Sequence, residues 1–208
     1  MSPEATNDPP APGTVRPRGR TERVRQAVVA ATMTELLAGG YGELTVERVA
    51  ATAGVAKSTV YRRWRDTGGL LAEWLDGMAA EEIPIPDTGS IEEDLRRFAI
   101  EITRVYTELP AGDMVLALIA EAVRNSQIAG DLRDFWRKRN DRAAEIARRA
   151  IAREELPEDT DPVEVIRAVA APIYYRLLVT HEPIDEAVAE QAAAAVLAGA
   201  RAGAYARR

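Results

Sequence analysis

The sequence has no cysteine and only one histidine, His181. Without cysteine the chain can form neither a disulfide framework nor a zinc–thiolate site. A single histidine also excludes a metal site built from several histidines and leaves little basis for histidine-dependent acid–base catalysis. We expect His181, which follows the predicted end of a helix, to act at that helix terminus. No metal or cofactor is expected.

Long apolar runs are also missing. The longest, residues 168–175 and 192–200, are too short to span a bilayer, and no leader with an apolar core opens the chain. We therefore expect a cytoplasmic protein without membrane contact. The 208 residues suffice for one or two domains with a real core. Because no strand pattern occurs, the sequence predicts an all-α fold of about nine helices.

The net charge of −6 is unusual for a protein that binds nucleic acid, but the charge is unevenly distributed. Residues 16–65 carry ten Lys or Arg and four acids, a balance of +6. Residues 73–208 carry 17 basic and 26 acidic residues, a balance of −9. A basic head is thus joined to an acidic body, and only the head is expected to approach phosphate.

The stretch from Thr45 to Arg65 predicts two short helices around a tight turn. Gly54 supplies the turn residue, and small Ala50 lets the helices cross closely. Val60 and Trp64, four residues apart, form the buried face of the second helix. The outward side chains are cations, hydroxyls and one aromatic: Lys57, Ser58, Thr59, Tyr61, Arg62 and Arg63. These types suit a helix in a DNA major groove; the alternative is a solvated face on a structural hairpin.

Residues from about 20 to 75 resemble the DNA-binding domain of the tetracycline-repressor (TetR) family of transcriptional regulators. The resemblance lies in VRQAVVAATMTELLAGGYGELTVERVA, AGVAKSTVYRRW and LLAEWL. It implies that Thr45 and Tyr61 bind phosphate and that Arg63 lies beside the DNA backbone. It also implies that three side chains face bases: Lys57, Thr59 and Arg62.

Two positions depart from the family pattern. Ala56 stands where the family usually has a serine-like cap. Thr67, followed by two glycines, stands where the family usually has a phosphate-gripping lysine, and this loss is expected to weaken nonspecific affinity. Arg65 is a candidate to compensate. Gly68 and Gly69 are interpreted as a flexible joint at the start of the fourth helix.

The expected domains are a disordered tail over residues 1–19, a DNA-binding domain over 20–66 and a ligand-binding and dimerisation domain over 67–208. The tail is rich in proline, and three arginines, among them Arg18 and Arg20, lie where it meets the DNA-binding domain. These arginines either enter a neighbouring minor groove or touch phosphate loosely as a solubilising leader. Both alternatives remain open.

Several helix boundaries follow from capping patterns. Thr21, Ser90 with Glu93, and Asp113 are predicted to cap the first, fifth and sixth helices. A seventh helix is expected from about 129 to 155. Its many arginines are interpreted as a salt-bridged, solvated face rather than a second nucleic-acid surface. The eighth helix begins at Asp161 and is interrupted by Pro172, and the ninth follows Asp185.

The resemblance implies that the body binds a ligand and dimerises. Aromatic side chains that would surround an interior space suit a small, mostly apolar ligand, although ordinary core packing is the alternative for each. The candidate ligand-binding residues are Trp74, Met78, Phe98, Ile102, Tyr106, Phe135, Trp136 and Tyr174. The candidate dimer residues, on the last two helices, are Ile166, Val169, Ile173, Leu177, Ala192, Ala195, Val196 and Gly199.

The sequence thus predicts a homodimeric repressor that leaves a palindromic DNA operator when a small-molecule effector binds the body. One rival is an architectural DNA-binding protein without a ligand. A second is a helical enzyme that carries this DNA-binding head. The carboxylates fall at caps and in helical pairs, and the sequence contains neither a glycine-rich phosphate loop nor a nucleophile elbow, so nothing in it favours an enzyme.

Overall fold

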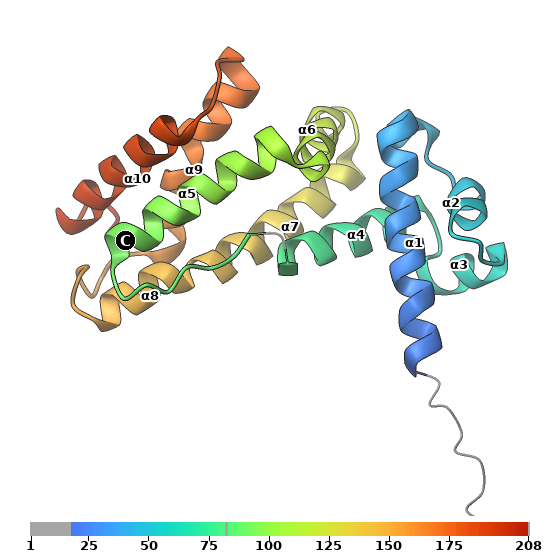
Figure 1. The fold of residues 1–208 in the computed structure, drawn as a ribbon, viewed down its shortest axis with the longest axis horizontal. Coiled ribbons are helices and arrows are strands. Elements are labelled where there is room, and N and C mark those ends of the chain that lie inside the picture. The colour runs from blue at the N-terminus through green and yellow to red at the C-terminus, as the bar shows by residue number, and fades with distance from the viewer. Residues whose placement is uncertain (1–17, 82, 208) are drawn as a thin grey trace, which may run out of the picture.

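The computed structural model describes residues 18–81 and 83–207, which are mostly helical (Figure 1). This confirms the all-α prediction. The helices are α1 (Arg18–Gly39), α2 (Val46–Thr52), α3 (Lys57–Trp64), α4 (Thr67–Glu81), α5 (Ile91–Glu108), α6 (Pro110–Ala122), α7 (Ser126–Ala143), α8 (Glu145–Ala152), α9 (Pro162–Tyr175) and α10 (Glu186–Arg201). A 3₁₀ turn, η1 (Tyr41–Glu43), follows α1, and a π-helical turn, η2 (Arg176–Thr180), follows α9. Among the described residues, β-type pairing is limited to one isolated bridge between Thr160 and Ala206.

Helices α1, α2 and α3 form the head at one end of the molecule (Figure 1). Thr45 caps α2 by accepting a hydrogen bond from the Arg48 backbone N–H, at 3.2 Å. Gly54 has φ of 66°, a left-handed conformation that side chains disfavour, so the tight turn between α2 and α3 depends on glycine. Val60 and Trp64 are buried, as their spacing predicts, and they hold α3 against the other head helices.

The head has no hydrophobic core of its own. Its cluster runs from Val28 and Val60 through Leu71 and Leu75 of α4 to Leu118 of α6. Residues of α7 complete it: Ile128, Leu132 and Phe135. The hydrophobic core therefore crosses the boundary expected near residue 66, and α4 lies between the head and α7 (Figure 1).

A second hydrophobic cluster fills the body between α5, α8, α9 and α10. It contains the apolar stripe expected along α5, including Leu95, Phe98 and Ile102. Asp161 and Asp185 cap α9 and α10 as predicted: Asp161 accepts from the Val163 and Glu164 backbone N–H groups, and Asp185 accepts from that of Val188.

Of three further capping predictions, two are wrong and one is correct in position only. Thr21 lies inside α1, which is already helical at Arg18. Ser90 is the N-cap residue of α5, as predicted, but its side chain makes no cap bond, and Glu93 pairs with Arg96 and Arg97 instead of completing a capping box. Asp113 lies in the first turn of α6, which begins earlier, at Pro110.

Two predicted helices are also divided differently. The expected seventh helix is split into α7 and α8, with Ala144 between them in a turn conformation. Pro172 lies inside α9, which passes into the π-helical turn η2 at Arg176. His181 ends that turn with φ of 53°, in agreement with the expected role at a helix terminus.

Candidate nucleic-acid interface and ligand cavity

The outward face of α3 carries the side chains expected to meet DNA. Lys57, Ser58, Arg62 and Arg63 are exposed, while Thr59 is half-buried. Three flanking candidates border this surface: Thr45 and Arg65, which are exposed, and half-buried Thr67. Arg20 is exposed on the first turn of α1. Arg18 opens that helix, and the rest of the expected arginine arm lies outside the described residues.

Tyr61 is 46% exposed and donates a hydrogen bond from its hydroxyl to the Glu47 carboxylate, at 2.9 Å. This bond raises the pKa of Tyr61. The pKa of Glu47 is lowered, first by a hydrogen bond from its own backbone and then by Tyr61. A Tyr61 hydroxyl that donates to phosphate must therefore leave the Glu47 carboxylate, which the sequence did not indicate.

Arg63 differs from the other cations of α3, because its guanidinium lies over the Trp64 ring, 5.0 Å from the ring centroid. Such cation–π contact orients a cation along the helix surface. Arg65, which ends α3, has φ of 65°, a left-handed conformation that is uncommon for a residue with a side chain. The chain therefore turns sharply between α3 and α4.

Two carboxylates form hydrogen bonds between the helices of the head and between α1, α3 and α4. Glu73 on α4 accepts from Trp64 Nε1 at 3.2 Å and from Arg25 of α1 at 3.1 Å. Glu35 of α1 accepts from Thr52 and from Arg48, and these two bonds, in that order, lower its pKa. Sequence reasoning missed both roles, since acids on helices are usually read as solvated.

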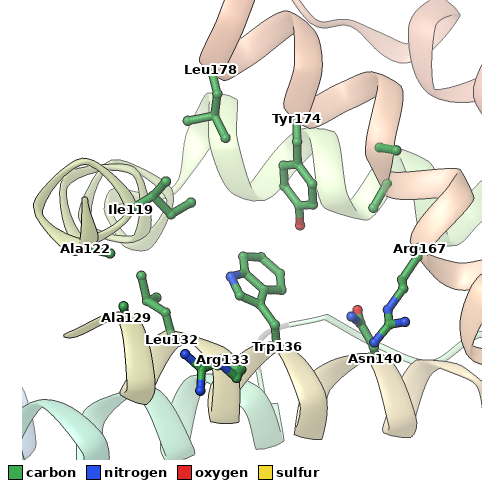
Figure 2. A pocket seen from close by; sticks show the side chains of 12 residues that line it. Ile119, Ala122, Ala129, Leu132, Arg133, Trp136, Asn140, Arg167, Tyr174 and Leu178 are labelled. Carbon is green, nitrogen blue, oxygen red and sulfur yellow. The ribbon is translucent and has the colours of Figure 1, made fainter. Parts of the chain in front are cut away.

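A cavity of about 530 Å³ lies in the body between α6, α7, α9 and η2 (Figure 2). Its walls are mostly apolar, with a few polar side chains: Ile119, Ala122, Ala129, Leu132, Arg133, Trp136, Asn140, Arg167, Ala170, Ala171, Tyr174 and Leu178. Small-molecule sites in proteins have this size and this composition.

The aromatic side chains at the cavity form one packed series. Trp136 lies edge-on to Tyr174, with ring centroids 5.3 Å apart, and to Phe135 at 4.8 Å. Tyr106 contacts Tyr174 at 5.5 Å, and their hydroxyls are hydrogen-bonded. Burial raises the pKa of Tyr174, so its hydroxyl stays protonated at neutral pH.

The candidate ligand-binding residues therefore separate into three groups. Trp136 and Tyr174 line the cavity, and Tyr106 and Phe135 pack behind them. The other four lie in the hydrophobic clusters and are not among the lining residues: Trp74 and Met78 in the head cluster, Phe98 and Ile102 in the body cluster. Sequence reasoning did not identify the polar lining residues Arg133, Asn140 and Arg167, which resemble any solvated helical position.

The candidate dimer residues also divide. Ile166, Val169 and Ile173 are buried inside this one chain, and so are Ala192 and Val196. Leu177 is half-buried, Ala195 is exposed, and half-buried Gly199 faces the Tyr205 ring. The exposed surface of these helices carries other apolar residues: Tyr175, Leu178, Val179, Ala187, Ala194 and Ala198.

Residues 18–81 and 83–207 include no helix that is both long enough and apolar enough to cross a membrane. In that part of the chain we also find no group of three or more His, Cys, Asp or Glu side chains that could hold a metal ion.

Comparison with known proteins identifies the family. A model described as "Tetracyclin repressor-like, C-terminal domain" matches residues 85–196, and one described as "Bacterial regulatory proteins, tetR family" matches residues 28–74. The chain belongs to the TetR family. Members of this family are DNA-binding transcriptional regulators, not enzymes, and the helix-turn-helix prediction for α2 and α3 is thereby confirmed.

Relatives and solved structures agree with this assignment to the TetR family. The HTH-type transcriptional regulator AqdR of Rhodococcus erythropolis is 31% identical over 88% of each chain. The DNA-binding transcriptional repressor TetR of Mycobacteroides abscessus is 28% identical over 82% of this chain and 88% of its own. The crystal structure of the TetR family regulator SCO0332 superposes with a TM-score of 0.71 and 31% identity, over 85% of this chain and 98% of that one.

Proposed function

We propose that the protein is a cytoplasmic, homodimeric repressor that binds a palindromic operator and leaves it when a small, mostly apolar ligand enters the body. The sign of regulation is supported by the Mycobacteroides abscessus relative, which is named a repressor. The DNA contacts are assigned to the exposed cations and hydroxyls of α3, with Thr45 and Tyr61 on phosphate.

The observation that carries this proposal is the position of α7. One face of α7 lines the cavity through Leu132 and Trp136. The same helix packs on α4, where Lys138 pairs with Asp76 at 2.6 Å, and both helices contribute to the head cluster. Glu73 of α4 in turn holds Trp64 of the recognition helix. A ligand that displaces α7 therefore acts on the orientation of α3 through direct contacts.

Exposed apolar side chains on the last helices supply the proposed dimer surface. Tyr175 at the end of α9 and Val179 in η2 are 57% and 61% exposed. Each is adjacent in sequence to a residue that lines the cavity, Tyr174 and Leu178. The exposed alanines of α10 permit close approach of a second copy. A twofold dimer presents two α3 helices to two half-sites, which is why a palindromic operator is expected.

Footprinting of the purified protein on the DNA upstream of its own gene tests the proposal. We expect one protected region with inverted half-sites whose centres lie about 34–36 Å apart, or a multiple of that distance. Uniform protection without sequence preference would instead identify an architectural DNA-binding protein. If no compound that fits the cavity weakens DNA binding, the ligand-dependent part of the proposal is wrong.

A further inference from the structure

The polar side chains of the cavity are all neutral or cationic. Two are arginines, Arg133 and Arg167, and one is the carboxamide of Asn140. Among the described residues that line the cavity there is no carboxylate, although the body as a whole is acidic. The cavity therefore differs in charge from the surface around it, and it offers hydrogen-bond donors beside apolar walls.

Arg133 is distinctive among the cations of α7 and α8. Its neighbours form ion pairs: Arg137 with Asp134, Lys138 with Asp76, and Arg148 with Asp141. Among the described residues, no carboxylate lies within ion-pair distance of Arg133. Arg133 is exposed and is one of the residues that line the cavity, where Figure 2 shows it beside Leu132 on α7.

The second arginine of the cavity lining, Arg167, already has a carboxylate partner. Arg167 pairs with Glu164, one turn earlier on α9, at 2.5 Å. In Figure 2 its side chain extends from α9 toward α7, where Asn140 lies. Arg133 therefore contributes the one positive charge of the lining that lacks a carboxylate partner in the described part of the chain.

This arrangement selects among ligands by charge. A neutral apolar ligand offers the exposed Arg133 guanidinium no hydrogen-bond acceptor, so its binding gains nothing from this side chain. A ligand with one anionic group could form a charge-assisted, bidentate hydrogen bond with that guanidinium. Its apolar body would lie against the Trp136 and Tyr174 rings, which their neighbours hold in place.

We propose that the effector class is an organic monoanion with an apolar body, such as a carboxylate, whose charged group is bound by Arg133. This inference rests on the proposed ligand-responsive function and adds the charge of the ligand to it. The polar groups of Asn140 and Arg167 provide further donors at the same cavity.

Matched probes test the inference by isothermal titration calorimetry on the full-length protein. The pairs are 2-naphthoate with 2-naphthamide and decanoate with decanamide, which share a body and differ in charge. We expect at least one carboxylate to bind about ten- to a hundredfold more tightly than its amide, the range for a hydrogen bond to a charged group. Equal binding within both pairs, or no binding by any of the four probes, would overturn the proposal.

Two variants assign the selectivity to one side chain. Arg133→Gln should remove the preference for the carboxylate while leaving amide binding nearly unchanged. Arg137→Gln is the control, because Arg137 lies one turn away, is exposed and is paired with Asp134. Loss of charge selectivity in both variants, or retention in Arg133→Gln, would contradict the assignment.

Two further measurements separate this inference from the proposed function. Sedimentation of Arg133→Gln should match that of the wild type; a shift to monomers would instead place Arg133 in a subunit contact and overturn the inference. Operator binding without probes is measured in parallel. If the protein binds the operator and a neutral compound releases it, the proposed regulatory function is supported and the proposed anionic effector is wrong.

Discussion

At the level of single residues, two buried side chains determine which part of α3 faces outward. Val60 and Trp64 are almost fully buried, whereas Arg62 falls on the opposite side of the helix and is exposed. This much follows from the sequence, because a four-residue apolar spacing defines the inner face of a helix. The bond from Tyr61 to Glu47 does not, since it joins two helices whose crossing depends on the folded head.

Different roles for Arg62 and Tyr61 lead to a first prediction. Arg62→Ala should relax base preference at one position per half-site and cost about 1–3 kcal/mol if the contact is bidentate to guanine. Tyr61→Phe should weaken all sequences nearly equally, because phosphate contacts carry no sequence information. Binding measured against a library of operator variants checks both results.

Glu47 provides the control for Tyr61. Glu47→Gln removes a carboxylate that accepts a hydrogen bond from the Tyr61 hydroxyl and that interacts electrostatically with Lys57. It should strengthen binding to all sequences, with the largest effect at low salt. The assignment is wrong if Tyr61→Phe changes the preferred sequence while Arg62→Ala does not.

At the level of helices, the turn between α3 and α4 corrects an interpretation made from the sequence. From the sequence alone, Gly68 and Gly69 suggest a flexible joint. In the structure a Cβ on Gly69 would lie 2.0 Å from the Trp64 carbonyl oxygen, so glycine is required by close backbone approach. Asp66 caps α4 by accepting from the Gly69 N–H at 2.9 Å. The turn is therefore tightly packed, and α4 and α3 are expected to move together.

A second prediction separates the two glycines. Gly69→Ala should lower the free energy of unfolding by about 1–3 kcal/mol, because backbone must shift to admit the methyl group. Gly68→Ala should change it little, since its Cβ would meet only side chains, Asp66 at 3.3 Å and Gln127 at 3.8 Å, and alanine favours the helix. Urea unfolding of both variants measures the difference; equal midpoints would restore the flexible joint.

Other elements show where sequence patterns stop being informative. Asp161 and Asp185 mark helix starts that the structure confirms in α9 and α10. The cavity could not be placed in this way. Trp136 and Phe135 are adjacent aromatics on one helix, yet the first lines the cavity and the second is buried behind it. Periodicity identifies an inward face but does not distinguish a packed core from an enclosed space.

At the level of the whole molecule, the same limit applies to the dimer. Ile166, Val169 and Ile173 form an apolar stripe that suggests an interface, but this stripe packs inside the chain. The exposed apolar residues of α9, η2 and α10 are instead Tyr175, Leu178, Val179 and small alanines. An isolated amphipathic helix shows one apolar face, and the sequence cannot indicate whether its own chain or a second copy covers that face.

The dimer surface gives the third prediction. Ala195 is exposed on α10, so Ala195→Arg should leave the chain folded while placing an unpaired charge against the second copy. We expect monomers by sedimentation. Operator binding should weaken by about a hundredfold or more, because a monomer engages one half-site and loses the gain from two linked contacts.

Two alanines serve as controls for Ala195→Arg. Ala120 is exposed on α6, away from α9 and α10 in the sequence, and Ala120→Arg should remain dimeric and bind the operator normally. Ala192 is buried within the chain, so Ala192→Arg should unfold the protein rather than separate intact subunits. A folded Ala195→Arg variant that sediments as a dimer and binds the operator like the wild type would exclude α10 from the interface. The subunits would then have to meet through another surface, with the two α3 helices placed differently on the operator.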